Sequence, residues 1–164
     1  MYFKEFPLRY YTLNKDRYII PDIISRVRFK DSAINSASVF IDYVIDNNES
    51  PQKLSTILYD SPVYDWVIFM FNDIYDYYEQ WPMDDTIFND YVSNKYGSTN
   101  IYNIHHYENK SKEIVESTHP AYDRVSVSNY EYEESINDNK RTIRLLNPKY
   151  LDSVVNELKE LLDE

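Results

Sequence analysis

The sequence predicts an α+β fold, and two observations carry this prediction. Residues 39–45 (VFIDYVI) and 141–146 (RTIRLL) are rich in β-branched and other apolar side chains, which is typical of strands. In several segments between and after them, apolar residues recur three or four positions apart, the spacing of one helix face. At 164 residues the chain can form one domain with a sizeable core, or a small core with large extensions.

Two Ser-Pro steps predict a pair of consecutive helices. Ser50 and Ser61 each precede a proline. A serine side chain accepts a hydrogen bond from an unpaired amide at a helix start, and proline has no amide to leave unpaired there. The first helix is expected at residues 51–59, and the second from residue 62 to Asn72. The second is apolar all round, so we expect it to be buried against a sheet.

Further elements are predicted downstream. Asp84 is the expected N-cap of a third helix, and Gly97 stands where a left-handed C-terminal cap belongs. Residues 101–117 are expected to form a β-hairpin, and a short charged helix is expected after Ser128. Asn147 precedes another proline and starts an amphipathic helix, which docks either on this domain or in a groove of a partner.

The N-terminal segment is aromatic and charged, without a regular period. Residues 1–17 are expected to be an extended arm that packs on this domain or on a neighbour. Asp22 is expected to cap a short helix. Arg26, Arg28 and Lys30 form a basic cluster. This cluster is either a solvated face or a contact with an acidic patch on a partner, such as another copy of this chain.

Composition excludes several classes of function. A single Gly leaves no room for a phosphate-binding loop, and a net charge of −11 argues against nucleic acid and anionic membranes as partners. The absence of Cys excludes disulfides and thiolate metal sites. Neither a signal peptide nor a membrane span is expected, so we expect a soluble protein made in the cytoplasm. The 18 Tyr favour protein–protein contacts.

Residues with catalytic potential have simpler explanations. Adjacent side chains of a strand point to opposite faces, so His105 and His106 need a bulge to share one metal ion. The acidic pairs at 84–85 and 133–134 are expected to be caps and solvated faces, not the separated carboxyls of a glycosidase. No nucleophile stands in a recognisable catalytic motif. We therefore expect no enzymatic activity, no metal site and no cofactor.

The order of elements between residues 39 and 82 is distinctive. A strand, a capped helix, a turn, a Tyr-x-Trp-Val helix, Asn-x-Ile and Trp-Pro follow one another. This combination resembles the baseplate wedge protein of T-even-type contractile-tailed phages (the wedge protein fifty-three family), which has a LysM-like core. The resemblance is strong over residues 40–97 and weaker over 140–162. It is carried by Ser50, Pro51, Leu54, Tyr59, Pro62, Tyr64, Trp66, Val67, Asn72, Ile74, Asp76, Trp81 and Pro82.

The resemblance implies a small LysM-like βααβ core, whose strand, helical hairpin and a third helix lie at residues 39–97 and whose closing strand comes later in the chain. An N-terminal arm with a short helix (1–38), an insertion with a β-hairpin (98–139), and a closing strand with a C-terminal helix (140–164) would extend it. The implied function is structural: holding neighbouring wedge subunits together in several symmetry-related copies, in a virion tail baseplate assembled in the host cytoplasm. The alternative is a LysM-like peptidoglycan- or chitin-binding module, in which Trp66 and Trp81 stack on sugars instead of packing in a core.

Side chains expected to contact partners lie in the N-terminal arm, in the tyrosine-rich loop after residue 72, and in the final helix. They are Arg26, Arg28, Phe29, Tyr75, Tyr77, Tyr78, Tyr150, Leu158 and Leu162.

Overall fold

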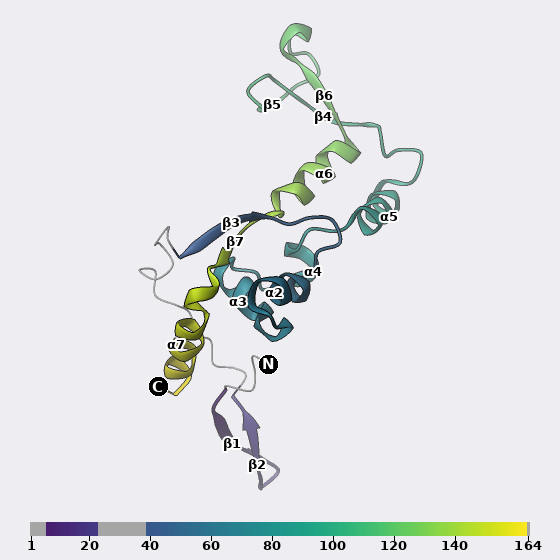
Figure 1. Cartoon of the computed structure of the whole chain (residues 1–164). Coiled ribbons are helices and arrows are strands. Elements are labelled where there is room, and N and C mark those ends of the chain that lie inside the picture. The colour runs from purple at the N-terminus through teal and green to yellow at the C-terminus, as the bar shows by residue number, and fades with distance from the viewer. Residues whose placement is uncertain (1–5, 23–38, 164) are drawn as a thin grey trace. The chain divides into compact units, whose positions relative to one another are not determined.

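The computed structural model of the chain describes residues 6–22 and 39–163 (Figure 1). The α+β class predicted from the sequence is confirmed. The chain divides into two compact units. Unit 1 comprises Met1–Tyr43, Glu49–Tyr77 and Ile143–Glu164, and unit 2 comprises Val44–Asn48 and Tyr78–Thr142. The short helix expected after Asp22 lies outside the described residues, as does the basic cluster.

Unit 1 is built on a pair of strands that are far apart in the sequence. Strand β3 (Phe40–Val44) pairs with β7 (Thr142–Leu146) (Figure 1). Backbone hydrogen bonds join Ile45 N to Arg141 O and Asn147 N to Val39 O, both at 2.9 Å. The residue numbers rise on one strand as they fall on the other, so the pair is antiparallel. The two paired strands are therefore separated in the sequence by residues 45–141, which include all the helices and strands of unit 2.

Helices α2 (Pro51–Tyr59) and α3 (Asp65–Phe71) follow β3, with the 3-10 turn η2 (Pro62–Tyr64) between them. The Ser50 side chain accepts from Lys53 N at 3.2 Å, and the Ser61 side chain accepts from Val63 N at 3.5 Å. Asp60 closes α2 in the left-handed region at φ 57°. Both predicted serine caps are confirmed.

The C-terminal part of unit 1 is the 3-10 turn η4 (Pro148–Tyr150) and helix α7 (Leu151–Asp163). Asn147 accepts a hydrogen bond from Lys149 N at 3.2 Å, as the sequence predicted. Apolar side chains from both helices before the insertion, from β7 and from α7 form the core of unit 1. The buried members are Leu54, Tyr59, Trp66, Val67, Ile68, Phe71, Ile143, Leu145, Leu146, Val154, Leu158 and Leu162.

Two side chains bind the backbone of β7. The Tyr59 hydroxyl donates to Leu146 O at 3.0 Å, in a buried setting. The Asn72 side chain donates to Arg144 O at 2.8 Å and accepts from Arg144 N at 2.8 Å, as a neighbouring strand would. Within the described residues this sheet has only two strands. Tyr59 and Asn72 therefore satisfy backbone groups that a third strand would otherwise pair.

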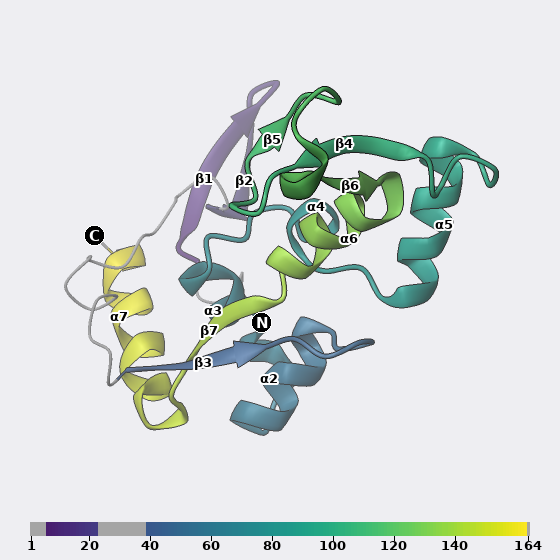
Figure 2. The same cartoon turned by 90° about the horizontal axis from the view of Figure 1, so that it is seen from above.

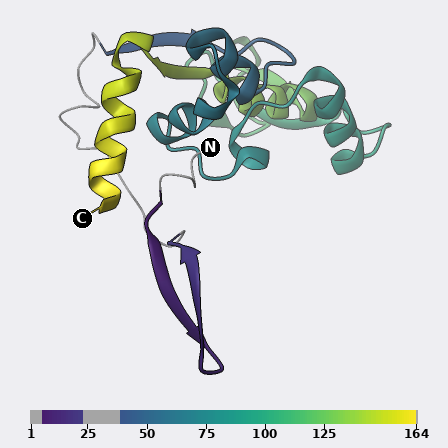
Figure 3. The same cartoon turned by 60° about the horizontal axis from the view of Figure 1, so that its bottom comes forward.

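The N-terminal arm forms a β-hairpin, which the sequence analysis did not predict. Strand β1 (Leu8–Leu13) pairs antiparallel with β2 (Asp16–Pro21) (Figure 3). Asn14 and Lys15 join them at φ 51° and 79°. Positive φ at both central residues is typical of the two-residue turns that match strand twist, and asparagine tolerates that conformation. In the sequence, the Asn14-Lys15 step was the feature that could have indicated this hairpin turn.

Unit 2 contains a three-stranded antiparallel sheet, two longer helices and most of a third, short helix (Figure 2). Strands β4 (Ile104–Glu108) and β5 (Ile114–Val115) form the predicted hairpin, and β6 (Val125–Ser128) adds an unpredicted third strand beside β4. The 3-10 turn η3 (Ala121–Asp123) precedes β6. Helix α6 (Asn129–Asn139) continues directly from β6, while α5 (Asp85–Tyr96) precedes the sheet. A short helix, α4 (Tyr77–Gln80), lies in the tyrosine-rich loop.

The helix ends in unit 2 follow the expected capping chemistry. The Asp84 side chain accepts from Thr86 N and Ile87 N, at 2.9 and 3.0 Å. Gly97 ends α5 at φ 77° and ψ 143°, so its φ is positive as expected, but it does not adopt the left-handed helical conformation that the sequence predicted. Ser128 and Glu131 form a reciprocal capping box at the start of α6. Helix α5 belongs to unit 2, whereas the sequence grouping placed it with the helical pair at 51–71.

Removing the Tyr59 hydroxyl tests the binding of β7. We expect Tyr59→Phe to lower the free energy of unfolding by about 1–3 kcal/mol, because the buried Leu146 carbonyl loses this donor. Urea denaturation followed by circular dichroism measures the change. Tyr122→Phe is the matched control, since that side chain is 79% exposed. Equal stability of the two variants would contradict the expectation.

Candidate interaction surfaces

The residues that carry the family resemblance are mainly structural. Most of them are buried or half-buried: Pro51, Leu54, Tyr59, Trp66, Val67, Trp81 and Pro82 are buried, Ser50, Tyr64, Asn72 and Ile74 are half-buried, and Pro62 and Asp76 are exposed. Trp66 lies in the core of unit 1, and Trp81 is buried in unit 2. Neither indole is therefore open as a platform for stacking on a sugar.

The expected partner-contacting residues divide into exposed and buried groups. Tyr75 and Tyr78 are each 86% exposed, and Tyr77 is also exposed. Tyr150 is half-buried beneath the ammonium of Lys149, which lies 4.7 Å from the ring centroid. Arg26, Arg28 and Phe29 lie outside the described residues.

Leu158 and Leu162 are core residues of unit 1 and not surface contacts. The apolar stripe of α7 is thus covered by the chain itself. Of the two alternatives left open for this helix, docking on its own domain is the one the structure has.

The β1–β2 hairpin presents apolar side chains on both of its faces. Residues directly opposite each other share a face, so the register places Tyr10 with Ile19 on one face and Tyr11 with Tyr18 on the other. Every residue of both strands is exposed. The exposed apolar side chains are Leu8, Tyr10 and Ile19 on the first face, and Tyr11, Leu13, Tyr18 and Ile20 on the second.

A buried carboxylate joins α5 to α6 within unit 2. Glu133 is only 4% exposed, and its two oxygens accept from Lys95 Nζ at 2.8 Å, Tyr96 Oη at 2.6 Å and Tyr91 Oη at 3.3 Å. Burial alone would raise the pKa of Glu133, but the hydrogen bonds from Lys95 and Tyr96 outweigh it and hold that pKa below its ordinary value. The expectation that Glu133 and Glu134 are solvated is wrong for Glu133, because α5 covers it.

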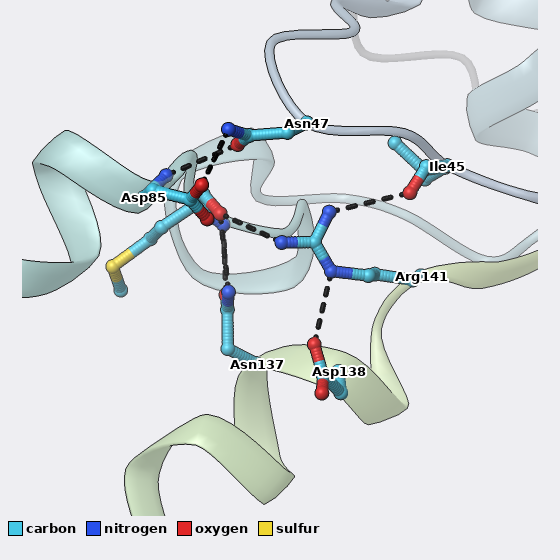
Figure 4. A network of polar contacts seen from close by, with 7 residues as sticks. Ile45, Asn47, Asp85, Asn137, Asp138 and Arg141 are labelled. Atoms are coloured by element: carbon cyan, nitrogen blue, oxygen red, sulfur yellow. Dashed lines mark hydrogen bonds and ion pairs between the residues drawn. The ribbon is translucent and has the colours of Figure 1, made fainter. Parts of the chain in front are cut away.

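A second polar network in unit 2 fixes turns around the end of α6 (Figure 4). Asn137 is buried; its side chain accepts from Met83 N at 2.8 Å and donates to Met83 O at 3.1 Å. Arg141 donates to Ile45 O at 3.2 Å and to Asp138 at 3.0 Å. Asn47 exchanges two hydrogen bonds with Asp85. These amide and guanidinium groups bind backbone and capping atoms, so their role is structural.

His105 and His106 lie closer together than a regular strand allows. The pairing of β4 with β6 shifts register between Ile104 and His106, and this irregularity brings the two Nδ1 atoms to 2.9 Å. His105 stacks on Tyr132 with ring centroids 3.9 Å apart, and His106 Nε2 lies 3.2 Å from Glu108. The imidazoles therefore do converge, but residues 6–22 and 39–163 hold no group of three potential ligands placed to bind a metal ion.

Comparison with known proteins finds no matching protein-family model and no matching curated protein.

In the part of the chain that the structure describes, no helix is both long and apolar enough to cross a bilayer. Among the same residues, every buried side-chain nitrogen and oxygen has a hydrogen-bond partner. The polar clusters thus serve internal contacts, and the hairpin and the exposed tyrosines offer the clearest surfaces for binding.

The Glu133 network predicts a pH-dependent stability. Because the folded-state pKa of Glu133 is lowered, its contribution is present above the ordinary carboxyl range and is lost as the pH falls through the lowered value. Glu133→Gln should therefore cost about 1–3 kcal/mol at neutral pH, and this difference from the wild type should shrink below about pH 4.

Thermal unfolding of both proteins between neutral and acidic pH measures the effect. Glu134→Gln, an exposed neighbour on α6, is the control and should change little at any pH. A Glu133→Gln penalty that stays constant down to acidic pH would show that the loss of charge is not its cause.

Proposed function

We propose that this chain is a structural subunit of a contractile-tail baseplate wedge, where it holds neighbouring wedge subunits together. One observation carries the proposal: residues of the family-like motif act together on one structural task. Tyr59 and Asn72, which stand 13 positions apart in the motif, both bind the backbone of β7. The motif thus accounts for the closure of a strand–helix–helix–strand unit, as the resemblance to a LysM-like core implies.

Surface properties support an assembly role. Tyr75, Tyr78, Tyr102 and Tyr122 are all strongly exposed, and tyrosine provides large contact area with a polar tip. The β1–β2 hairpin adds apolar side chains on two faces. A compact unit that fixes geometry, together with exposed aromatic and apolar extensions, suits a protein that links several neighbours. The proposed location is accordingly the tail baseplate of a virion.

A peptidoglycan- or chitin-binding module is the competing candidate. Such a module binds sugar rings on exposed aromatic side chains, and Tyr75, Tyr77 and Tyr78 are exposed aromatics that closely follow the helical pair in sequence. The two tryptophans that would serve this role best are buried. The geometry therefore favours protein contacts over glycan stacking.

Affinity capture tests the proposal directly. The tagged chain is recovered from a lysate of infected host cells, and co-purifying proteins are identified by mass spectrometry. We expect other baseplate wedge subunits, retained at moderate salt. Recovery of the chain alone, with binding to purified peptidoglycan, would overturn the proposal in favour of the glycan-binding module.

Two variants sharpen the capture experiment. Trp66→Ala removes a buried indole and should destabilise unit 1 by about 3–5 kcal/mol, so wedge subunits should no longer co-purify. Ile57→Ser changes an exposed side chain of α2 and should leave co-purification intact.

A further inference from the structure

The β1–β2 hairpin has two strands and exposes apolar side chains on both faces, an arrangement with little stability of its own in water. Tyr10 is 74% exposed and Ile19 is 60% exposed, although they are direct cross-strand partners. An isolated two-stranded hairpin is at best marginally stable in water, because it has no third strand or helix to cover a face. Its stable form therefore needs a surface to pack against.

The arrangement of side chains shows that this surface must be apolar in part. Leu8, Tyr10 and Ile19 project from one face, and Tyr11, Tyr18 and Ile20 from the other. Because both faces carry aromatic and aliphatic groups, covering one of them still leaves the second open. A partner that contacts both faces of the hairpin would therefore bury more of its apolar side chains than a partner that contacts one face.

Charge indicates the nature of the partner. Residues 6–22 carry Arg9, Lys15 and Arg17 against two acidic residues, Asp16 and Asp22. Arg9 is paired with Asp22 at 3.0 Å. Residues 39–164, in contrast, contain 10 basic and 24 acidic side chains. The arm carries a small excess of positive charge, at Lys15 and Arg17 near its tip, and the rest of the chain is strongly anionic, so the two are electrostatically complementary.

We propose that the β1–β2 hairpin is a docking arm that binds acidic side chains among residues 39–163 of a second copy of this chain. The contact joins unlike surfaces, arm to body, so two copies can exchange arms reciprocally or several copies can close a ring. Apolar side chains of the hairpin supply the buried contact area, and Lys15 and Arg17 provide attraction to the acidic body. The inference does not depend on the baseplate function.

Sedimentation equilibrium of the purified full-length chain tests this docking. The chain has a mass of 19.8 kDa, and we expect species of at least twice that mass at low ionic strength. The double variant Tyr10→Ser/Ile19→Ser should weaken self-association by about tenfold or more, as loss of central aromatic and aliphatic anchors does. Ile57→Ser is the matched control, because Ile57 is 66% exposed on α2 and should not alter association.

A charge variant keeps the test valid if the apolar variant unfolds the hairpin. Lys15→Gln/Arg17→Gln leaves every apolar contact of the hairpin in place. It should weaken association at about 50 mM NaCl and have a smaller effect at about 500 mM, where charges are screened. A wild-type chain that stays monomeric at all concentrations would overturn the proposal, as would hairpin variants that associate like the wild type. The experiment uses no other phage protein, so it can fail while the proposed wedge function stands.

Discussion

The closure of β7 onto β3 is the constraint on which unit 1 depends. The two strands are separated by residues 45–141, so their pairing must offset the entropy of closing a long loop. Burial of Ile143, Leu145 and Leu146 on β7 supplies apolar contact. Tyr59 and Asn72 then bind backbone groups of β7 that the two-stranded sheet does not pair. Strand β7, which lies near the C-terminus, is thus held in place by Tyr59 and Asn72, two side chains from much earlier in the sequence.

Hydrogen bonds from polar side chains to partners distant in sequence also stabilise unit 2. Buried polar side chains bind backbone or ionic partners that are distant in sequence, as Asn137 does with Met83 and Glu133 does with Lys95. A buried polar group without a partner is costly, so each of these side chains is a specific requirement for one arrangement of the chain.

With one Gly in the chain, turns depend largely on Asn and Asp at positive φ, including Asn48, Asp60 and Asp73.

Local chemistry explains which elements could be predicted from the sequence. The caps at Ser50, Ser61, Asp84 and Asn147 act within three residues of the helix they start, so the signal and the structure lie in the same short segment. Long-range features were less accessible. The partnership of Asn72 with Arg144 and the covering of Glu133 by α5 depend on packing that no local pattern encodes. The convergence of His105 and His106 needed a strand irregularity that alternation does not predict.

Hydrogen exchange at the amide of Arg144 tests the central claim most directly. In Asn72→Ala this amide loses its acceptor, whereas Asn89→Ala removes only a local side-chain bond to Asp85 O within α5. We expect exchange at Arg144 to accelerate by about tenfold or more in Asn72→Ala, with Asn89→Ala matching the wild type. Unchanged protection at Arg144 in Asn72→Ala would contradict the account, because β7 would then be held without its side-chain partner.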